Sequence, residues 1–149
     1  MKKVFNIDSL QHMEVFAATI AESVFPGFVI GLAGDLGAGK TTFTQFFGKA
    51  LGVRDSINSP TFTIMKHYEG RYFLTHIDAY RLEGSYSDES LEAYIFGDGI
   101  SVVEWWPYIK YSMPDAFLSI KIVFIEGTKR RVEVEGSGKY EYVIRALSH

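Results

Sequence analysis

The chain contains no cysteine, which excludes disulfide bonds and thiolate metal sites from its 149 residues. This absence fits a reducing compartment, and we expect a cytoplasmic protein. No stretch approaches the ~18 consecutive apolar residues that a transmembrane helix requires, so we expect no membrane segment. We also expect no signal peptide, because polar side chains at positions 6, 8 and 9 interrupt the apolar run that one needs.

Positive charge is not in excess either, because 15 Lys and Arg stand against 18 Asp and Glu, for a formal net charge of −3. A protein that grips RNA or DNA by itself usually carries an excess of basic residues. We therefore expect any nucleic-acid role to be indirect, through partner proteins. Hydrophobic content of 47% and charged content of 22% are ordinary for a globular protein, and without a linker or repeat, residues 1–149 are predicted to form a single domain.

Residues 34–42 carry the most specific motif of the chain and read Gly-Asp-Leu-Gly-Ala-Gly-Lys-Thr-Thr. Positions 34–41 fit the phosphate-binding pattern G-x-x-x-x-G-K-[ST]. Glycines let backbone N–H groups turn inward around a polyanion. Lys40 can then reach the β- and γ-phosphates of a nucleotide, and the Thr41 hydroxyl can bind Mg²⁺. The alternative is a chance glycine turn between a strand and a helix, which the flanking sequence disfavours.

An apolar run over 28–33 precedes this loop, and apolar residues at helical spacing over 43–51 follow it before Gly52. A helix after the loop would place its positive end beneath bound phosphates. The pattern also predicts strands over 4–7, 61–68, 72–78, 100–107, 118–124 and 132–135. Helices are predicted over 10–24, over 87–95 and over 140–147. Asp8-Ser9 offers an N-cap for the first of them, and Asp8 and Gln11 have capping-box spacing. We expect an α/β protein with the P-loop NTPase fold, in which helices flank a mostly parallel central sheet with antiparallel hairpin additions.

Two predicted strands end on an acidic residue after an apolar run, one at Asp78 and the other at Glu104. In open α/β sheets the ligand lies beyond the carboxyl ends of the strands, and metal-bound ATP needs a carboxylate near the Thr41 hydroxyl. Both acids are therefore candidates for the metal site or for catalysis. The structural alternatives are a solvated carboxylate for Glu104, and an ion pair with Arg81 or a turn cap for Asp78.

Three further segments are ambiguous from the residues alone. Hydroxyl groups over 59–63 are suited to sensing a γ-phosphate, as switch loops do, or belong to an ordinary strand start. The basic turn over 129–131 is either solvated or places a positive group at the nucleotide. Trp105 and Trp106 are expected to supply a core anchor and an exposed contact, whereas His67 and His76 lack metal-ligand spacing and are assigned no zinc role.

Taken together, several segments resemble the bacterial TsaE ATPases, which serve threonylcarbamoyladenosine modification of tRNA. They are 34–42, 59–63 (Ser-Pro-Thr-Phe-Thr), 76–82 (His-Ile-Asp-Ala-Tyr-Arg-Leu) and 102–105 (Val-Val-Glu-Trp), and the resemblance extends over residues 8–135. It implies a weak ATPase that uses Mg²⁺ and acts with TsaD, which transfers the threonylcarbamoyl group, and its companion TsaB. The ATPase would reset that assembly between turnovers, so tRNA would be met only indirectly.

The same resemblance implies roles for individual residues. Thr41 and Glu104 would hold Mg²⁺, and Asp78 would orient or activate the attacking water. Lys40 would bind phosphates and act in catalysis, Ser59 and Thr61 would belong to a switch-like loop, and Arg130 matches a basic position near the nucleotide. The residues expected to contact the nucleotide are Asp35, Leu36, Gly37, Ala38, Gly39, Lys40, Thr41, Thr42, Ser59, Thr61 and Arg130.

Two other functions stay open at this point. A small-molecule kinase of the phosphate-loop class usually carries an arginine-rich lid, whereas the arginines here are scattered except for Arg130 and Arg131. A nucleotide-sensing module would bind without useful turnover. ATP is favoured over GTP by the resemblance, and because the chain has no Asn-Lys-x-Asp stretch to read guanine.

Overall fold

A seven-stranded sheet forms the centre of the computed structural model, which describes residues 1–60, 63–85 and 87–147. Across the sheet the strands follow in the order β1 (Lys2–Ile7), β7 (Lys129–Glu135), β6 (Leu118–Glu126), β2 (Val29–Ala33), β5 (Ile100–Glu104), β4 (Phe73–Asp78) and β3 (Met65–Glu69). The central strands β6, β2, β5 and β4 are parallel to one another. The hairpins β6–β7 and β3–β4 are antiparallel, as the sequence predicted, and the β1–β7 pair is also antiparallel.

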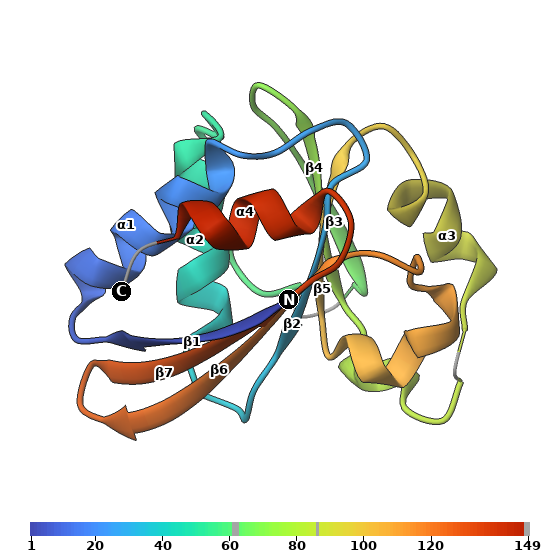
Figure 1. Ribbon diagram of the computed structural model, residues 1–149. Coiled ribbons are helices and arrows are strands. Elements are labelled where there is room, and N and C mark those ends of the chain that lie inside the picture. The colour runs from blue at the N-terminus through green and yellow to red at the C-terminus, as the bar shows by residue number, and fades with distance from the viewer. Residues whose placement is uncertain (61–62, 86, 148–149) are drawn as a thin grey trace.

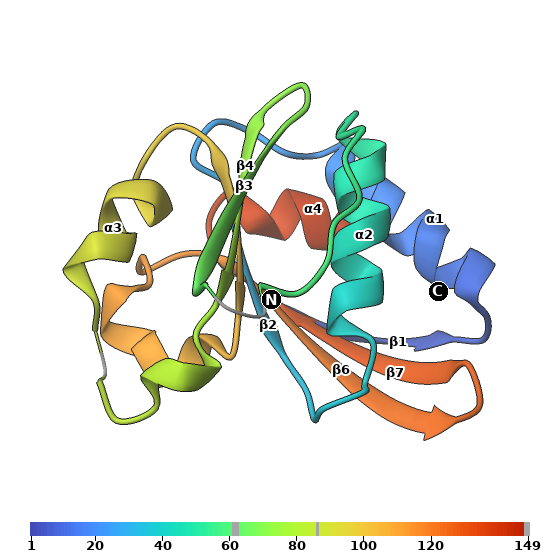
Figure 2. The ribbon, with the colours of Figure 1, turned by 180° about the vertical axis from the view of Figure 1, so that it is seen from behind.

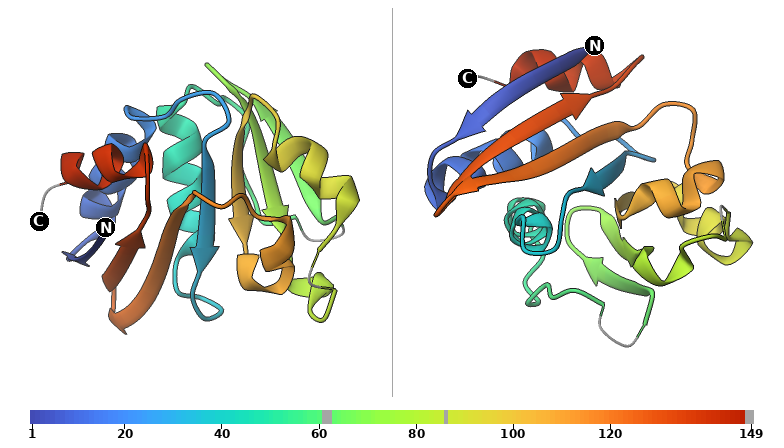
Figure 3. Two further views of the ribbon diagram at one scale, coloured as in Figure 1. Left: turned by 45° about the vertical axis from the view of Figure 1, so that its right-hand side comes forward. Right: turned by 90° about the horizontal axis from the view of Figure 1, so that it is seen from below.

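Helices cover both faces of this sheet. The helices α1 (Leu10–Ala21), α2 (Lys40–Ala50) and α4 (Tyr140–Ala146) lie on one face, and α3 (Glu89–Ile95) lies on the other (Figures 1 and 2). The 3₁₀ helices η1 (Tyr80–Leu82) and η2 (Trp106–Ser112) lie on the same side as α3 (Figure 3). The strands β2 and β5 at the centre are therefore buried on both faces, which explains why these two strands read as largely apolar runs.

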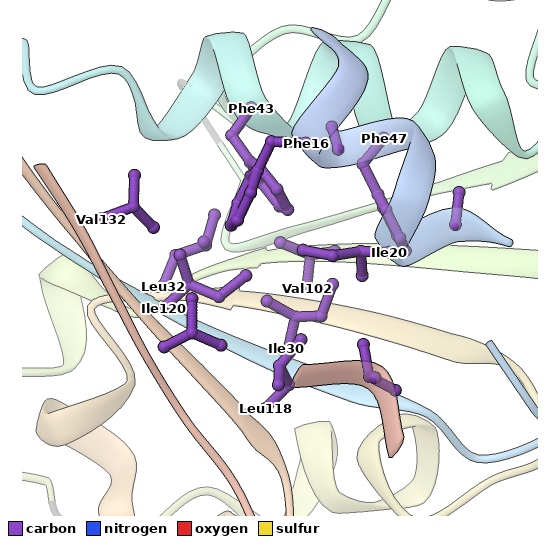
Figure 4. Packing of buried hydrophobic residues seen from close by; sticks show 14 of the residues in the cluster. Phe16, Ile20, Ile30, Leu32, Phe43, Phe47, Val102, Leu118, Ile120 and Val132 are labelled. Carbon is purple, nitrogen blue, oxygen red and sulfur yellow. The ribbon is translucent and has the colours of Figure 1, made fainter. Parts of the chain in front are cut away.

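Alternation along each strand divides the core into two clusters. Ile30 and Leu32 of β2 face α1 and α2, where they meet Phe16 and Phe43 (Figure 4). The opposite face of β2 carries Val29, which belongs to the second cluster with α3.

Gly31 of β2 makes room for a large side chain on the second face. A Cβ built at Gly31 would lie 2.7 Å from Cδ1 of Trp106 and 2.8 Å from Cε2 of Phe117. Trp106 is thus the core anchor expected from the tryptophan pair, and a glycine inside the strand is required by this close approach.

The predicted elements are confirmed, with corrections at their ends. Helix α1 ends at Ala21 rather than 24, and β5 ends at Glu104 rather than 107. The strand predicted over 61–68 corresponds to β3, which spans Met65–Glu69, and positions 61 and 62 lie outside the described residues. The N-cap predicted at Asp8-Ser9 is confirmed at Ser9, which accepts a hydrogen bond from the His12 N–H at 3.0 Å. The capping-box spacing from Asp8 to Gln11 is wrong, because the cap lies one residue further along the chain. None of the helices in the described part of the chain has the length and hydrophobicity needed to cross a lipid bilayer.

Candidate functional site

The glycine-rich loop, residues 34–41, runs from the end of β2 into the first turn of α2. Gly34, Gly37 and Gly39 have φ values of 145°, 79° and 114°, a region that side chains with a Cβ rarely enter. A Cβ at Gly34 would also lie 2.5 Å from the Ile122 carbonyl oxygen of β6. The glycines are therefore needed both for the turn itself and for its close approach to the neighbouring strand.

Lys40 is the first residue of α2 and is only 5% exposed. Its Nζ donates hydrogen bonds to the carbonyl oxygens of Gly34 (2.6 Å) and Asp35 (3.0 Å). Burial lowers the pKa of the Lys40 ammonium from its ordinary value, and the nearby carboxylates of Glu104 and Asp78 act in the opposite direction. The loop thus holds a largely desolvated cation within its own turn.

Strand register brings the two predicted acids together beside this cation. In the parallel pairing, Leu32 of β2 lies opposite Glu104 of β5, which lies opposite Asp78 of β4. The row therefore begins with an apolar residue of the core and ends with two carboxylates on the side facing α2. Glu104 is 3% exposed, so the solvated-carboxylate alternative is wrong for it.

His76 supports Glu104 from the preceding row of the sheet. The imidazole is fully buried, and its Nε2 lies 2.5 Å from Oε2 of Glu104. The other ring nitrogen, Nδ1, is buried and has no hydrogen-bond partner among the described residues. Because a carboxylate only accepts, the proton belongs on Nε2. Sequence reasoning missed this pair, since positions 76 and 104 become neighbours only through the β4–β5 register.

Asp78 lies at the very end of β4 and is half-buried. Its Oδ1 accepts a hydrogen bond from the Tyr80 N–H at 3.1 Å, which is the turn contact anticipated as an alternative role. Burial, assisted by the charge of Glu104, raises the pKa of the Asp78 carboxyl above its ordinary value, although the Tyr80 bond opposes this. Asp78 is thus a carboxylate with increased proton affinity at the edge of the site.

A cavity of about 310 Å³ connects the loop, the acids and the segment after α2. The Thr41 Oγ1 and Ser59 Oγ atoms share a hydrogen bond of 2.7 Å, so the two hydroxyls meet at this cavity. Its lining consists of Leu36, Gly37, Gly39, Lys40, Thr41, Thr42, Ser59, Asp78, Glu104 and Trp105. Most of the residues proposed from sequence therefore surround one space.

Some predicted residues lie elsewhere. Ala38 is a buried residue of the loop, and together with Arg130 it lines a second cavity, to which Gly39 and Thr42 also belong. The Asp35 carbonyl accepts from Lys40, although Asp35 does not line the first cavity. Thr61 lies outside the described residues.

Trp105 was not predicted to belong to the site. It follows Glu104 directly and has a φ of 59°, which is unusual for any residue with a side chain. Its ring stacks on Tyr108 with centroids 5.5 Å apart, and the Lys40 Nζ lies 4.7 Å from its centroid. The indole therefore forms one wall of the cavity and contacts the buried cation.

The fold and this site define a class of mixed α/β protein whose sheet is parallel at its centre. A glycine-rich loop connects its strand β2 to helix α2, and two acidic strand ends lie beside that loop.

Comparison with known proteins gives the family. The family model described as "Threonylcarbamoyl adenosine biosynthesis protein TsaE" matches residues 7–132. The Bacillus subtilis (strain 168) TsaE protein is 39% identical over 140 residues, covering 93% of this chain and 89% of the relative. The Treponema pallidum (strain Nichols) TsaE protein is 30% identical over 128 residues, covering 85% and 95%. The crystal structure of Bacillus subtilis YdiB matches with a TM-score of 0.81 at 33% identity, covering 97% of this chain and 93% of that one.

The chain therefore belongs to the TsaE family, whose proteins take part in tRNA threonylcarbamoyladenosine biosynthesis.

The raised pKa of Asp78 predicts a gain in stability when its charge is removed. Asp78→Asn keeps an oxygen that can accept from Tyr80 and should raise the free energy of unfolding at pH 7. Because the pKa is higher in the folded state, the gain is present above that folded pKa. It disappears as pH falls below the ordinary value of 3.8, where both states are protonated.

Urea unfolding of both proteins from about pH 8 down to about pH 3 measures this difference. Asp55→Asn, on the exposed loop after α2, is the matched control and should show no such pH-dependent gain. A wild-type protein more stable than Asp78→Asn at pH 7 would contradict the prediction.

Loss of the His76 hydrogen bond should destabilise the fold. His76→Leu leaves the buried Glu104 carboxylate without this donor, and we expect a loss of about 2–3 kcal/mol in the free energy of unfolding. The double variant His76→Leu with Glu104→Gln should lose less than the sum of the two single variants, because both partners are then changed. Additive losses in chemical denaturation would show that the two side chains are not coupled.

Proposed function

We propose that this protein binds Mg²⁺·ATP in the first cavity and hydrolyses it within a single domain of the P-loop NTPase fold. The hydrolysis would serve tRNA threonylcarbamoyladenosine formation, in company with TsaD and TsaB. The observation that carries the proposal is the meeting of Lys40 and Thr41 with the carboxylates of Glu104 and Asp78 around one cavity.

The phosphate chain is assigned to the glycine-rich loop and the start of α2. The N-terminus of a helix presents free N–H groups and a partial positive charge, which together favour a polyanion. The desolvated Lys40 ammonium adds a full charge beside them. Its bonds to two loop carbonyls would be exchanged for stronger, charge-assisted bonds to phosphate oxygens.

The chain's own oxygen donors suit Mg²⁺. The Thr41 hydroxyl and the Glu104 carboxylate line the same cavity, and His76 fixes the carboxylate through Oε2. Among the described residues there is no group of three His, Asp or Glu side chains that could hold a metal. A site of two protein ligands matches the way Mg²⁺ is usually shared with phosphates and water. When bound, Mg²⁺ would neutralise charge that develops on the phosphates.

Asp78 is assigned to the attacking water. Its raised pKa makes it a better proton acceptor than an ordinary aspartate, and its bond from Tyr80 holds the carboxyl in place. Ser59, which reaches the Thr41 hydroxyl, would link the segment after α2 to the metal side of the site. This link supports a switch-like role for that segment.

We assign the base as adenine in keeping with the family resemblance.

Two substitutions separate binding from hydrolysis. Lys40→Ala should weaken ATP binding by about tenfold to a hundredfold, because a buried charge–phosphate interaction is lost. Glu104→Ala should leave ATP affinity within a few-fold of wild type and lower hydrolysis by about a hundredfold, because the metal loses its carboxylate. Calorimetric titration and phosphate release measure the two effects. Lys49→Ala, on the same helix but 76% exposed at its side chain, is the control and should change neither.

The proposed partnership is tested by phosphate release from ATP with and without TsaD and TsaB. We expect slow hydrolysis by the protein alone, faster hydrolysis with both partners, and none with Lys40→Ala. Transfer of the γ-phosphate to a small acceptor would instead favour a kinase. Binding without turnover, even with both partners present, would favour a nucleotide sensor and overturn the proposed hydrolysis.

A further inference from the structure

Arg130 of β7 lies behind the glycine-rich loop and contacts it through the backbone. Its Nε donates a hydrogen bond of 2.6 Å to the Ala38 carbonyl oxygen. Its Nη1 donates to the carbonyls of Gly127 at 2.7 Å and Lys129 at 3.0 Å, in the turn of its own hairpin. The guanidinium also lies 4.8 Å from the centroid of the Phe124 ring. One planar cation therefore joins the β6–β7 hairpin to the loop.

The Ala38 carbonyl belongs to the same peptide unit as the Gly39 N–H. In a trans peptide these two groups point in opposite directions, and no cis bond occurs in the described chain. Holding the carbonyl toward Arg130 therefore turns the Gly39 N–H away from Arg130, toward the other side of the loop. Gly39 lines the first cavity, so this orientation presents its N–H to a phosphate there.

This peptide unit would otherwise be free to rotate. Gly39 has a φ of 114° and no Cβ, and its neighbourhood is open except for the Arg130 Nε at 3.7 Å from an ideal Cβ position. A glycine flanked by a rotatable peptide has many accessible conformations. The hydrogen bond from Arg130 excludes one of these conformations. In that conformation the Ala38 carbonyl oxygen would point into the first cavity, where it would repel a phosphate.

Arginine is better suited than lysine to holding the Ala38 carbonyl in one direction. Its rigid, planar set of donors bonds the loop with one edge and the hairpin turn with another, while its face lies over Phe124. A lysine ammonium could reach one carbonyl but has no plane with which to fix the direction of the bond.

We propose that Arg130 is a positioning residue, which orients the Ala38–Gly39 peptide so that the Gly39 N–H is set to bind a phosphate. This inference rests on the proposed nucleotide binding. It changes the meaning of the basic position expected from sequence, because Arg130 acts through the backbone and requires no contact with the nucleotide.

The test compares ATP with inorganic tripolyphosphate, which has the phosphate chain but neither ribose nor base. We expect Arg130→Ala to weaken both ligands by a similar factor of about tenfold, because one amide–phosphate bond is impaired. Arg130→Lys should give a smaller loss, and it keeps the experiment informative if the alanine variant is poorly folded. Calorimetric titration gives the affinities, and thermal unfolding without ligand shows whether each variant is folded.

Arg131→Ala is the matched control, since it removes the same charge from the adjacent position. Arg131 points to the other face of the sheet, where its Nε lies 3.5 Å from Oε2 of Glu133, and its loss should leave both affinities within about twofold of wild type. A backbone amide readout adds a direct signature. On addition of tripolyphosphate, the ¹⁵N–¹H signal of Gly39 should move downfield in wild type and Arg131→Ala, and move much less in Arg130→Ala.

Three results would overturn the proposal. If Arg130→Ala weakens ATP but not tripolyphosphate, the guanidinium contacts the ribose or base directly. If Arg131→Ala causes the same loss, net charge alone is responsible. If Arg130→Ala binds both ligands as wild type does, the peptide needs no support. Failure of the wild-type protein to bind either ligand would overturn the proposed function itself, and this inference with it.

Discussion

The parallel register of β2, β5 and β4 is the constraint on which the site depends. It sets Leu32, Glu104 and Asp78 in one row at the carboxyl ends of the strands, directly under the start of α2. A shift of one residue in either pairing would move an acid to the opposite face, because side chains alternate along a strand. The buried rows beneath, with Ile30 and Val102, make such a shift costly and so protect the position of the acids.

The site places charged side chains beside an apolar part of the sheet. Hydrogen bonds to neighbouring groups lower the free-energy cost of burying these charges. His76 supplies a donor to Glu104, and two loop carbonyls accept from Lys40. Buried charges without such partners cost several kcal/mol. Asp78 has the weakest support, since a single backbone bond opposes its burial. Asp78, whose pKa is raised, is also the residue that we propose acts on the attacking water. Perturbed pKa values are typical of active-site residues.

The backbone at Trp105 also has a conformation that costs stability and places the indole ring at the site. A left-handed conformation at a non-glycine residue costs about 1–3 kcal/mol and persists only when surrounding contacts hold it. Stacking on Tyr108 and the edge contact with Tyr80 provide such contacts. The result is an aromatic wall immediately after the buried acid, with the Lys40 ammonium against it. Arg130 makes the corresponding contact on the other side of the loop, so the loop is held from both sides.

The sequence alone determined the loop, the helix that follows it and the acidic ends of two strands, because each depends on local spacing: glycines for the turn, apolar periodicity for the elements. The expectation of a mostly parallel sheet also placed those strand ends at one edge, although the sequence did not predict which strands are neighbours. Only the tertiary structure decided that Glu104 is buried against His76, that Trp105 is a wall and Trp106 an anchor against Gly31, and that Arg130 supports the loop from behind. These relations join residues distant in the chain, through strand register and through a hairpin contact, and no local pattern encodes either of them.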